Sequence, residues 1–279
     1  MKTIIVATNF SPSCLNAAHY AVALSKQMGI NEIVLYHSFS LPLAIELPLL
    51  NTNDEHSLYN TSITKLILLK EGLSPLVNEG TNIITIANDQ PLITGITNLS
   101  EQYPQSLLVI GASEKPKAES VLIGSNTAGL IKQEQLPILI IPNKTSYKLI
   151  KRVVYACDLK RISEDMLEQW IKNFIDKLGA HLILVNISHD EADNFKPNIL
   201  DDIYKLHSIW EDKNPDYHYI DRKDIVKGII EFTETHQADL IIAVPKTYSF
   251  FNQMFHRSIS SKLASHTYLP LLLLRENPE

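Results

Sequence analysis

The chain carries one pattern of apolar, strand-like segments twice, and this repeat constrains its fold more strongly than any other feature. Four segments of the first half recur in the same order in the second half, roughly 140 residues later. The matched pairs are residues 4–9 with 152–158, 32–37 with 181–186, 106–111 with 238–243, and 136–141 with 269–274. The repeat predicts two similar domains in tandem, residues 1–144 and residues 150–279, joined by a short polar stretch.

Strand-like and helix-like segments alternate within each half. The β-branched run at residues 3–8 is typical of a strand that is buried on both faces, and Ser11-Pro12 then predicts a helix that ends before Gly29. Further strands are predicted at residues 32–37, 82–87, 107–110 and 138–141, a loop at 38–54, and helices at 56–77, 91–103, 163–178, 198–212 and 224–236. Strands that alternate with helices form a parallel sheet, and the connections between such strands are right-handed. The predicted fold class is therefore α/β, with two doubly wound domains and helices on both faces of each parallel sheet.

The composition and the common motifs exclude several classes of protein. A net charge of −6 and a pI near 5.9 argue against a nucleic-acid or anionic-membrane partner, which needs a concentrated basic face. We find neither a signal peptide nor a run of about 18 apolar residues, so a soluble, cytoplasmic protein is expected. Cys14 and Cys157 lie outside any CxxC pair, and no HExxH, GxSxG, GxGxxG or GxxxxGK(S/T) motif occurs. We therefore expect no metal site and no catalytic residue.

Residues 106–142 contain the strongest chemical signal in the chain. A predicted strand ends at Gly111, and Gly124-Ser125 opens a short predicted helix whose first N–H groups have no partner within the helix. This arrangement is typical of an anion cradle. Two interpretations stay open for Ser125, which either contacts a phosphate or only caps the helix.

Polar residues of other strands are expected beside this cradle. Ligands of open parallel sheets bind beyond the carboxyl ends of the strands, where Thr8, Asn9 and Ser38 are predicted to lie. Asn9 also has two open interpretations, because it either contacts a ligand or only shapes the turn before Ser11-Pro12.

The residues resemble those of a known family. The opening IIVATNFSPSC, the alternation of strands and helices, and the stretch VIGASEKPKAESVLIGSNTAGLIKQEQLPILIIP are similar to the universal stress proteins of the UspA type. The tandem repeat extends the resemblance over essentially the whole chain. The resemblance implies five parallel strands and about four helices per domain, in an adenine nucleotide alpha hydrolase-like fold. It also implies that members with a Gly-x2-Gly-x9-Gly-(Ser/Thr) signature bind ATP.

The first half keeps part of that signature. Gly111 and Gly124-Ser125 match it, whereas Glu114 stands at the second glycine and Asn9 stands where the family usually has Asp. A Cβ and a carboxylate at position 114 oppose the close approach of a polyanion, so weak binding of ATP with Mg²⁺ is expected in domain one. The candidate nucleotide-binding residues are Ala7, Thr8, Asn9, Ser38, Gly111, Glu114, Gly124, Ser125 and Asn126.

The second half departs further from the signature. Its degenerate site is predicted to comprise Asp158, Ala243, Lys246, Arg257 and Ser258. In this alignment Ala243, Lys246 and Arg257 replace the three glycines, and the long side chain of Arg257 would fill the phosphate cradle. We therefore expect no nucleotide in domain two. The nearby aromatic residues are explained either by packing or by an apolar ligand; these residues are Tyr248, Phe250, Phe251 and Phe255.

Two classes of function follow from these patterns. The first is a stress-response, regulatory binding protein with weak adenine-nucleotide binding in domain one. The alternative is a scaffold or small-ligand-binding protein whose nucleotide sites have degenerated. We do not expect an enzyme, because no general base or metal-binding carboxylate can be singled out, and weak ATPase activity stays open as a third and weaker possibility. From the resemblance we also expect the two domains to pair as an intramolecular pseudo-dimer, and tandem chains to form a further homodimer, with no nucleic-acid or membrane partner.

Overall fold

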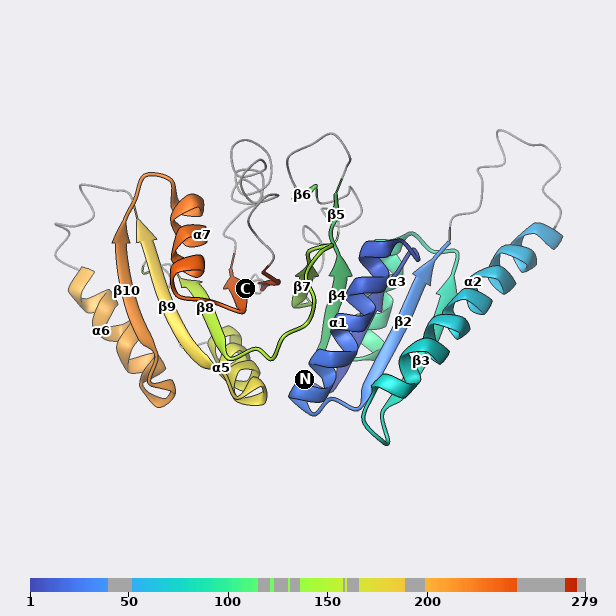
Figure 1. The fold of residues 1–279 in the computed structure, drawn as a ribbon, viewed down its shortest axis with the longest axis horizontal. Helices are drawn as coiled ribbons and strands as arrows, with labels where there is room; N and C mark the ends of the chain where they lie inside the picture. The colour runs from blue at the N-terminus through green and yellow to red at the C-terminus, as the bar shows by residue number, and fades with distance from the viewer. Residues whose placement is uncertain are drawn as a thin grey trace. The chain divides into compact units, whose positions relative to one another are not determined.

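The computed structural model describes residues 1–39, 52–114, 121–122, 130, 136–157, 159, 166–188, 199–244 and 269–274. The chain divides into two compact units, residues 1–113 with 123–147 and residues 114–122 with 148–279, which we call unit one and unit two. Each unit contains parallel strands with helices against them (Figure 1), so the α/β fold class predicted from the sequence is confirmed.

Unit one contains five parallel strands in its described part, in the order β7-β4-β1-β2-β3. Their bounds are β1 Thr3–Ala7, β2 Glu32–Ser38, β3 Asn82–Asn88, β4 Ser106–Gly111 and β7 Ile138–Ile141. All residues of the central strand β1 are buried, because helices cover both faces of the sheet and apolar side chains are favoured on each. A short strand pair, β5 (Ser113–Glu114) with β6 (Val121–Leu122), follows β4 in the chain, and its residues from Glu114 onward are counted with unit two.

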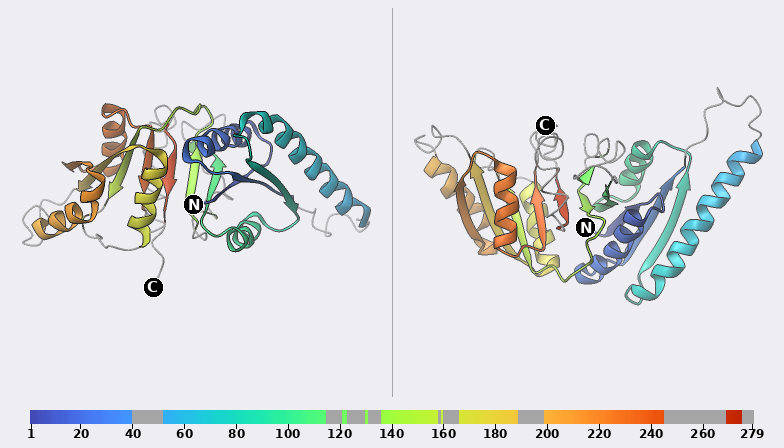
Figure 2. Two further views of the ribbon diagram at one scale, coloured as in Figure 1. Left: turned by 90° about the horizontal axis from the view of Figure 1, so that it is seen from below. Right: turned by 45° about the horizontal axis from the view of Figure 1, so that its top comes forward.

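The helices of unit one cover the two faces of its sheet unequally. They are α1 Pro12–Met28, α2 Thr52–Leu73, which continues into the 3-10 helix η1 Ser74–Leu76, and α3 Leu92–Gln102. Figure 2 shows α1 and α2 on one face and α3 on the other. Helix α1 begins with Pro12 in its first turn and ends at Gly29, whose left-handed φ of 64° suits glycine.

Unit two repeats this topology. Its described strands are β8 Arg152–Cys157, β9 His181–Ser188, β10 Asp216–Asp221, β11 Leu240–Ala243 and β12 Leu271–Leu273. Their order is β10-β9-β8-β11-β12, with every pair parallel. The helices are α5 Met166–Leu178, α6 Ile199–Trp210 with the 3-10 helix η4 Glu211–Lys213, and α7 Ile225–Thr235. The repeated topology confirms the internal repeat inferred from the sequence.

Strand β10 is missing from the repeats found in the sequence. Its residues, DYHYID, place two tyrosines and a histidine in succession between acidic ends, with Ile220 as the one aliphatic residue, and so contain no apolar run. Within unit two, β10 lies beside β9 alone, and an edge strand with partly exposed side chains needs no such run.

Several predicted bounds change. The helix predicted at 56–77 begins earlier, at Thr52, and its α-helical part stops at Leu73. The chain then forms a 3-10 turn because Pro75 lacks the N–H that a further helical hydrogen bond needs. In the predicted loop at 38–54, residues 40–51 lie outside the described residues. Of the helix predicted after Gly124, the structure describes Leu130, which is helical and buried. Within the described ranges, no helix is long and apolar enough to cross a lipid bilayer.

Candidate functional site

The strand registers of unit one bring several predicted site residues to one edge of the sheet. Ala7 pairs with Tyr36 on one side and with Ile110 on the other, so Thr8 and Gly111 follow at the carboxyl ends of neighbouring strands. Ser38 ends the adjacent strand β2. Parallel strands end at the same edge of a sheet, and this edge is where ligands of such folds bind.

The turn after β1 is shaped by two side-chain oxygens. Thr8 Oγ1 accepts a hydrogen bond from the N–H of Phe10 at 3.0 Å, and Asn9 Oδ1 accepts one from the N–H of Ser11 at 3.0 Å. The structure thus shows the turn-shaping role that was one of the two interpretations of Asn9. Asn9 is nevertheless exposed, and its amide group keeps two donors for a ligand.

Phe10 occupies an unusual backbone conformation in this turn. Its φ is 63°, in the left-handed region that a bulky residue rarely adopts. The Phe10 ring lies 4.6 Å from the His37 ring, and Lys65 Nζ lies 5.5 Å from the centre of the Phe10 ring. These ring and cation contacts, together with the hydrogen bond to Thr8, stabilise the strained backbone.

His37 holds the ends of β1 and β2 together. Its Nδ1 lies 2.7 Å from the carbonyl oxygen of Thr8, and since a carbonyl only accepts, Nδ1 carries the proton. Burial lowers the pKa of His37, and the nearby charge of Lys65 lowers it further, while the hydrogen bond to Thr8 opposes the shift. At neutral pH the ring is therefore uncharged, and Nε2 is an acceptor.

Ser38 belongs to a polar network between β2, β3 and α3. Its hydroxyl donates to the carbonyl oxygen of Gln90 at 2.6 Å. Asn88 Oδ1 accepts from the Tyr36 hydroxyl at 2.7 Å and from the Gln90 N–H at 3.3 Å, and Asn98 Nδ2 donates to Gln90 Oε1 at 2.9 Å. Sequence reasoning did not identify Tyr36, Asn88, Gln90 or Asn98, because the two bonds that join this network to β2, Tyr36 to Asn88 and Ser38 to Gln90, link residues far apart in the chain.

Gly111 has a packing role that is independent of any ligand. A Cβ at this position would lie 2.3 Å from the carbonyl oxygen of Ser13 and 2.9 Å from the backbone nitrogen of Cys14. Both atoms belong to the first turn of α1, so a side chain at 111 would force the helix away from the end of β4.

The rest of the predicted signature is described only in part. Glu114 lies in β5, and its side chain is outside the described set, as are all atoms of Gly124, Ser125 and Asn126.

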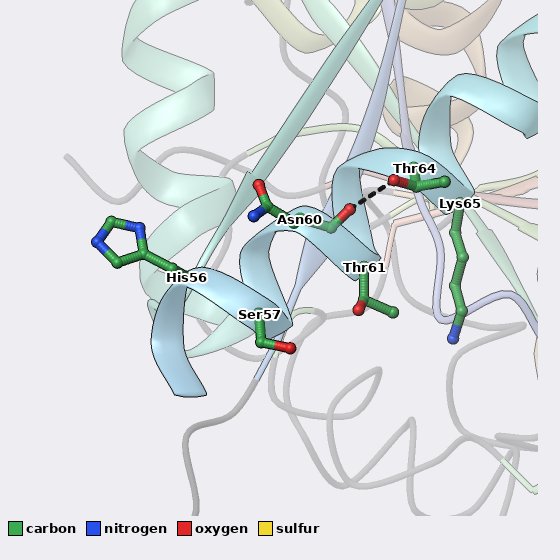
Figure 3. Close-up of a pocket in the computed structure, with 6 residues that line it drawn as sticks. All are labelled: His56, Ser57, Asn60, Thr61, Thr64 and Lys65. Atoms are coloured by element: carbon green, nitrogen blue, oxygen red, sulfur yellow. Dashed lines mark hydrogen bonds between the residues drawn. The ribbon is translucent and has the colours of Figure 1, made fainter. Parts of the chain in front are cut away.

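A cavity of about 640 Å³ lies along α2, close to the turn after β1. Figure 3 shows the side chains that line it, all of which belong to this helix. They are His56, Ser57, Asn60, Thr61, Thr64 and Lys65. Sequence reasoning missed this surface, because hydroxyl and amide side chains at helical spacing are common on solvated helix faces. Among the described residues, no group of three or more His, Cys, Asp or Glu lies together as a metal site would require.

The comparison with protein families decides the relationship of the chain. The model of the universal stress protein family matches residues 1–142, which is more than half of the chain. The chain belongs to the universal stress protein family. No curated protein matches it.

Solved structures similar to this universal stress protein cover both of its halves. A universal stress protein from Archaeoglobus fulgidus matches over 98% of both chains, with a TM-score of 0.71 and 17% identity. The cytoplasmic domain of a prokaryotic cation chloride cotransporter matches over 98% of this chain and 95% of its own, with a TM-score of 0.55 and 10% identity. At these identities the likeness shows the fold alone, and the fold is that of a tandem universal stress protein.

The strand registers correct one residue of the site predicted in the second half of this universal stress protein. The sequence alignment makes Ala243 the counterpart of Gly111, whereas the strand pairing in the two units makes Val244 the counterpart of Gly111. Two backbone hydrogen bonds support the counterpart assigned by the strand pairing. The N–H of Leu108 donates to the carbonyl oxygen of Pro137 at 2.9 Å, and the N–H of Ile241 donates to that of Pro270 at 3.0 Å. The deciding pairs are Ala7 with Ile110 in unit one and Ala156 with Ala243 in unit two.

The corrected register also changes the aligned motif. The second position moves from Lys246 to Thr247, and nine residues then separate Thr247 from Arg257, as nine separate Glu114 from Gly124. Lys246 and Arg257 lie outside the described residues, together with Asp158 and Ser258.

Unit two keeps one cross-strand contact of unit one, and among its described residues an apolar side chain replaces a polar neighbour of that contact. Asn186, the counterpart of His37, donates from Nδ2 to the carbonyl oxygen of Cys157 at 3.1 Å. Ile187 stands where unit one has Ser38. Burial raises the pKa of the Cys157 thiol to about 12, so it is protonated at neutral pH.

Proposed function

We propose that this universal stress protein is a regulatory, stress-response binding protein, not an enzyme, and that its domain one, residues 1–144, binds an adenine nucleotide weakly. The observation that carries the proposal is the difference between the two strand-end clusters. Unit one gathers Thr8, Asn9, His37 and Ser38 at the carboxyl ends of β1 and β2. Unit two places Ile187 and the protonated thiol of the half-buried Cys157 at the positions of Ser38 and Thr8.

The strand-end groups suit the polar edge of a purine or a ribose. Asn9 offers amide donors, and the neutral His37 ring offers Nε2 as an acceptor. These complementary groups fit a base that carries both donors and acceptors. Mg²⁺ is expected to enter with the nucleotide, because it keeps most of its waters and binds phosphate oxygens.

Calorimetric titration with MgATP tests the proposal. Asn9→Ala is expected to weaken binding about tenfold by removing hydrogen bonds to the ligand. Glu114→Gly is expected to strengthen binding by removing a like charge beside the phosphates. The matched control is Asp158→Ala, which alters the corresponding position of unit two and should leave the affinity unchanged. Binding that survives Asn9→Ala but requires Asp158 would place the nucleotide in unit two and overturn the proposal, as would no heat with either MgATP or adenosine.

A second candidate function is a scaffold or small-ligand-binding protein that takes no nucleotide. The observation that favours it is the contact of Gly111 with the backbone of Ser13, since packing alone requires the glycine. Partner proteins captured by the wild-type chain in equal amounts with and without ATP, together with no calorimetric signal for MgATP, would support this function over the first.

A further inference from the structure

Two histidines of unit two meet where strand β10 faces the end of helix α7. The centre of the His218 ring lies 4.8 Å from that of the His236 ring, with 64° between the two planes, and both side chains are partly buried. Each ring also lies against Phe232 of α7, with centres 4.9 Å apart for His218 and 3.8 Å apart for His236. These three rings join β10 to the last turn of α7, and we call them the histidine contact.

The hydrogen bond of His236 determines where this ring takes a second proton. Its Nδ1 lies 2.9 Å from the carbonyl oxygen of Phe232, and since a carbonyl only accepts, Nδ1 carries the proton of the neutral ring. A second proton therefore adds to Nε2 and leaves this bond intact. The ring can gain a positive charge while it keeps its place beside His218.

Asp216 is the carboxylate that offsets positive charge on His218. It lies two residues before His218, on the same face of β10, and its Oδ2 lies 2.8 Å from Nε2 of His181 on β9. A protonated His181 would therefore compete with His218 for this carboxylate. The side chain of Asp216 is 61% exposed, so water screens its attraction to either ring.

Arg152 of β8 adds a permanent positive charge near His236. Its Nη1 donates to the carbonyl oxygen of His236 at 3.1 Å. The carboxylate of Asp239 accepts the backbone N–H groups of Arg152 and Lys151, at 2.9 and 2.8 Å. Acid would therefore place three imidazolium rings and a guanidinium around two carboxylates.

The charged side chains of α7 itself do not change this balance. Glu231 pairs with Arg222 and with Lys227, and Glu234 is exposed to solvent. An exposed carboxylate contributes little to the energy of a partly buried ring.

Burial keeps His218 neutral at neutral pH. It lowers the pKa of His218, and a positive charge on His236 lowers this pKa further, while Asp216 opposes the shift. Because the pKa lies below its ordinary value of 6.5, the unfolded chain binds more protons than the folded chain as the pH falls through this region. The stability that depends on the neutral ring is therefore present above pH 6.5 and declines below it.

Repulsion at His218 acts on a weakly supported strand. Within unit two, β10 forms its ladder with β9 alone, whereas β9, β8 and β11 each lie between two strands. The side chains of β10 are exposed or only partly buried. Local opening costs least where few buried contacts hold the backbone, so β10 is expected to respond before the inner strands do.

We propose that His218 and His236 form an acid-sensitive latch, in which neutral rings hold β10 against α7 and protonation of both rings loosens this edge of unit two. The latch goes beyond the proposed nucleotide binding, because it lies in unit two and needs no ligand. It gives the chain a response to acid that uses no residue of the strand-end cluster in unit one.

NMR titration of the histidine rings tests the coupling between His218 and His236. The proteins are the wild type, His236→Gln and the control His207→Gln, which removes a histidine that contacts β10 from α6. In His236→Gln the titration midpoint of His218 is expected to rise, because the repulsion from a neighbouring imidazolium is lost. His207→Gln should leave that midpoint as it is in the wild type. An unchanged midpoint in His236→Gln overturns the latch.

Hydrogen exchange tests whether acid opens the edge of the sheet. Exchange of the β10 amides is compared with that of the β11 amides in one sample, because the ratio cancels the pH dependence of the chemical step. On passing below pH 6.5, the protection of β10 relative to β11 should fall in the wild type and in His207→Gln. It should fall less in His236→Gln and in a second variant, His218→Gln.

The change with pH is compared within each variant, so a variant that is less stable at neutral pH still gives a result. Circular dichroism at neutral pH checks that each variant folds. Constant protection of β10 in the wild type, or an equal fall in all four proteins, overturns the latch.

Discussion

His37 and Asn186 occupy the same place in the two halves of the chain, and each reaches from the second strand to the backbone of the first. His37 Nδ1 bonds to the carbonyl oxygen of Thr8, and Asn186 Nδ2 bonds to that of Cys157. Imidazole and carboxamide are different groups, yet both supply an N–H at this point. The contact therefore belongs to the fold, because both units need the ends of these strands held together.

The residues beside His37 and Asn186 differ in polarity between the two units. Ser38 and Asn88 of unit one form hydrogen bonds beside His37, whereas Ile187 and Ile220 occupy the corresponding ladder positions in unit two. The strand ends of the two units thus share this hydrogen bond, while the side chains beside it differ in polarity. The comparison teaches that the first strand pair alone does not identify a binding site in this fold.

The largest effect is expected at the position where unit one has Gly111 and unit two has Val244. Gly111→Val places in unit one the residue that unit two carries at position 244, and its Cβ would meet the backbone of Ser13. We expect unit one to lose about 3 kcal/mol of unfolding free energy, since backbone atoms yield less than side chains. Urea unfolding followed by circular dichroism measures the loss.

The two tryptophans assign such a loss to a unit. Trp170 and Trp210 both belong to unit two, so their fluorescence follows that unit. Gly111→Val should move the dichroism transition to lower urea and leave the fluorescence transition in place. Val244→Gly is the matched control and should affect unit two. A wild-type dichroism transition in Gly111→Val would contradict the packing role of the glycine.

A helix glycine that occurs in both units gives a smaller effect. In α3, a Cβ at Gly95 would lie 1.7 Å from the Tyr36 hydroxyl oxygen, whereas in α7 a Cβ at Gly228 would lie 3.0 Å from Ile187 Cδ1. Gly95→Ala should destabilise unit one by about 2 kcal/mol, because the Tyr36 ring must move and its hydrogen bond to Asn88 is lost.

Gly228→Ala is the matched control for that change. The end of the Ile187 side chain is flexible, and alanine favours a helix over glycine by about 1 kcal/mol, so the stability of unit two should stay the same or rise. Equal losses in the two variants would show that the tyrosine contact does not govern the effect.

The smallest effect concerns the acid sensitivity of the strand-end contact. The pKa of His37 in the folded chain lies below its ordinary value of 6.5, so the unfolded chain binds more protons as the pH falls through this region. The stability that depends on neutral His37 is therefore present above pH 6.5 and declines as the pH falls below it. His37→Asn installs the side chain of unit two, which donates the same hydrogen bond and does not titrate.

Thermal unfolding at a series of pH values measures the difference. Below pH 6.5 the wild type should lose more stability than His37→Asn, and the two should converge above that pH. Other titrating groups act in both proteins and cancel in the difference. Parallel curves over the whole range would show that protonation of His37 is not coupled to unfolding.

Most strands were predictable because burial on both faces demands apolar residues, as in β1 and β4, where five consecutive residues of each are fully covered. The register in which such strands pair was harder to predict from the sequence. A run of Leu, Ile and Val looks alike when it is shifted by one residue, and only the ladder hydrogen bonds show that Val244, not Ala243, is the counterpart of Gly111.

The candidate site likewise contains residues that could be predicted from the sequence and residues that could not. Thr8, Ser38 and Gly111 could be placed together, because parallel strands end at one edge of the sheet. Lys65 and the α2 face could not, since no local motif indicates which side of a polar helix faces a strand end. The structure also shows why position 111 requires glycine apart from the nucleotide motif, because a Cβ there would collide with the backbone of Ser13.

The left-handed backbone of Phe10 bears on any attempt to transplant this turn into another protein. A conformation of this kind costs of the order of 1 to 3 kcal/mol and persists only when surrounding groups compensate for it. Here the compensation comes from Thr8, from His37 on β2 and from Lys65 on α2. A peptide or loop graft that carries only residues 8–11 would lack two of these three supports and should relax to a different shape. A designer who wants the shape of this turn must bring the neighbouring strand and helix with it.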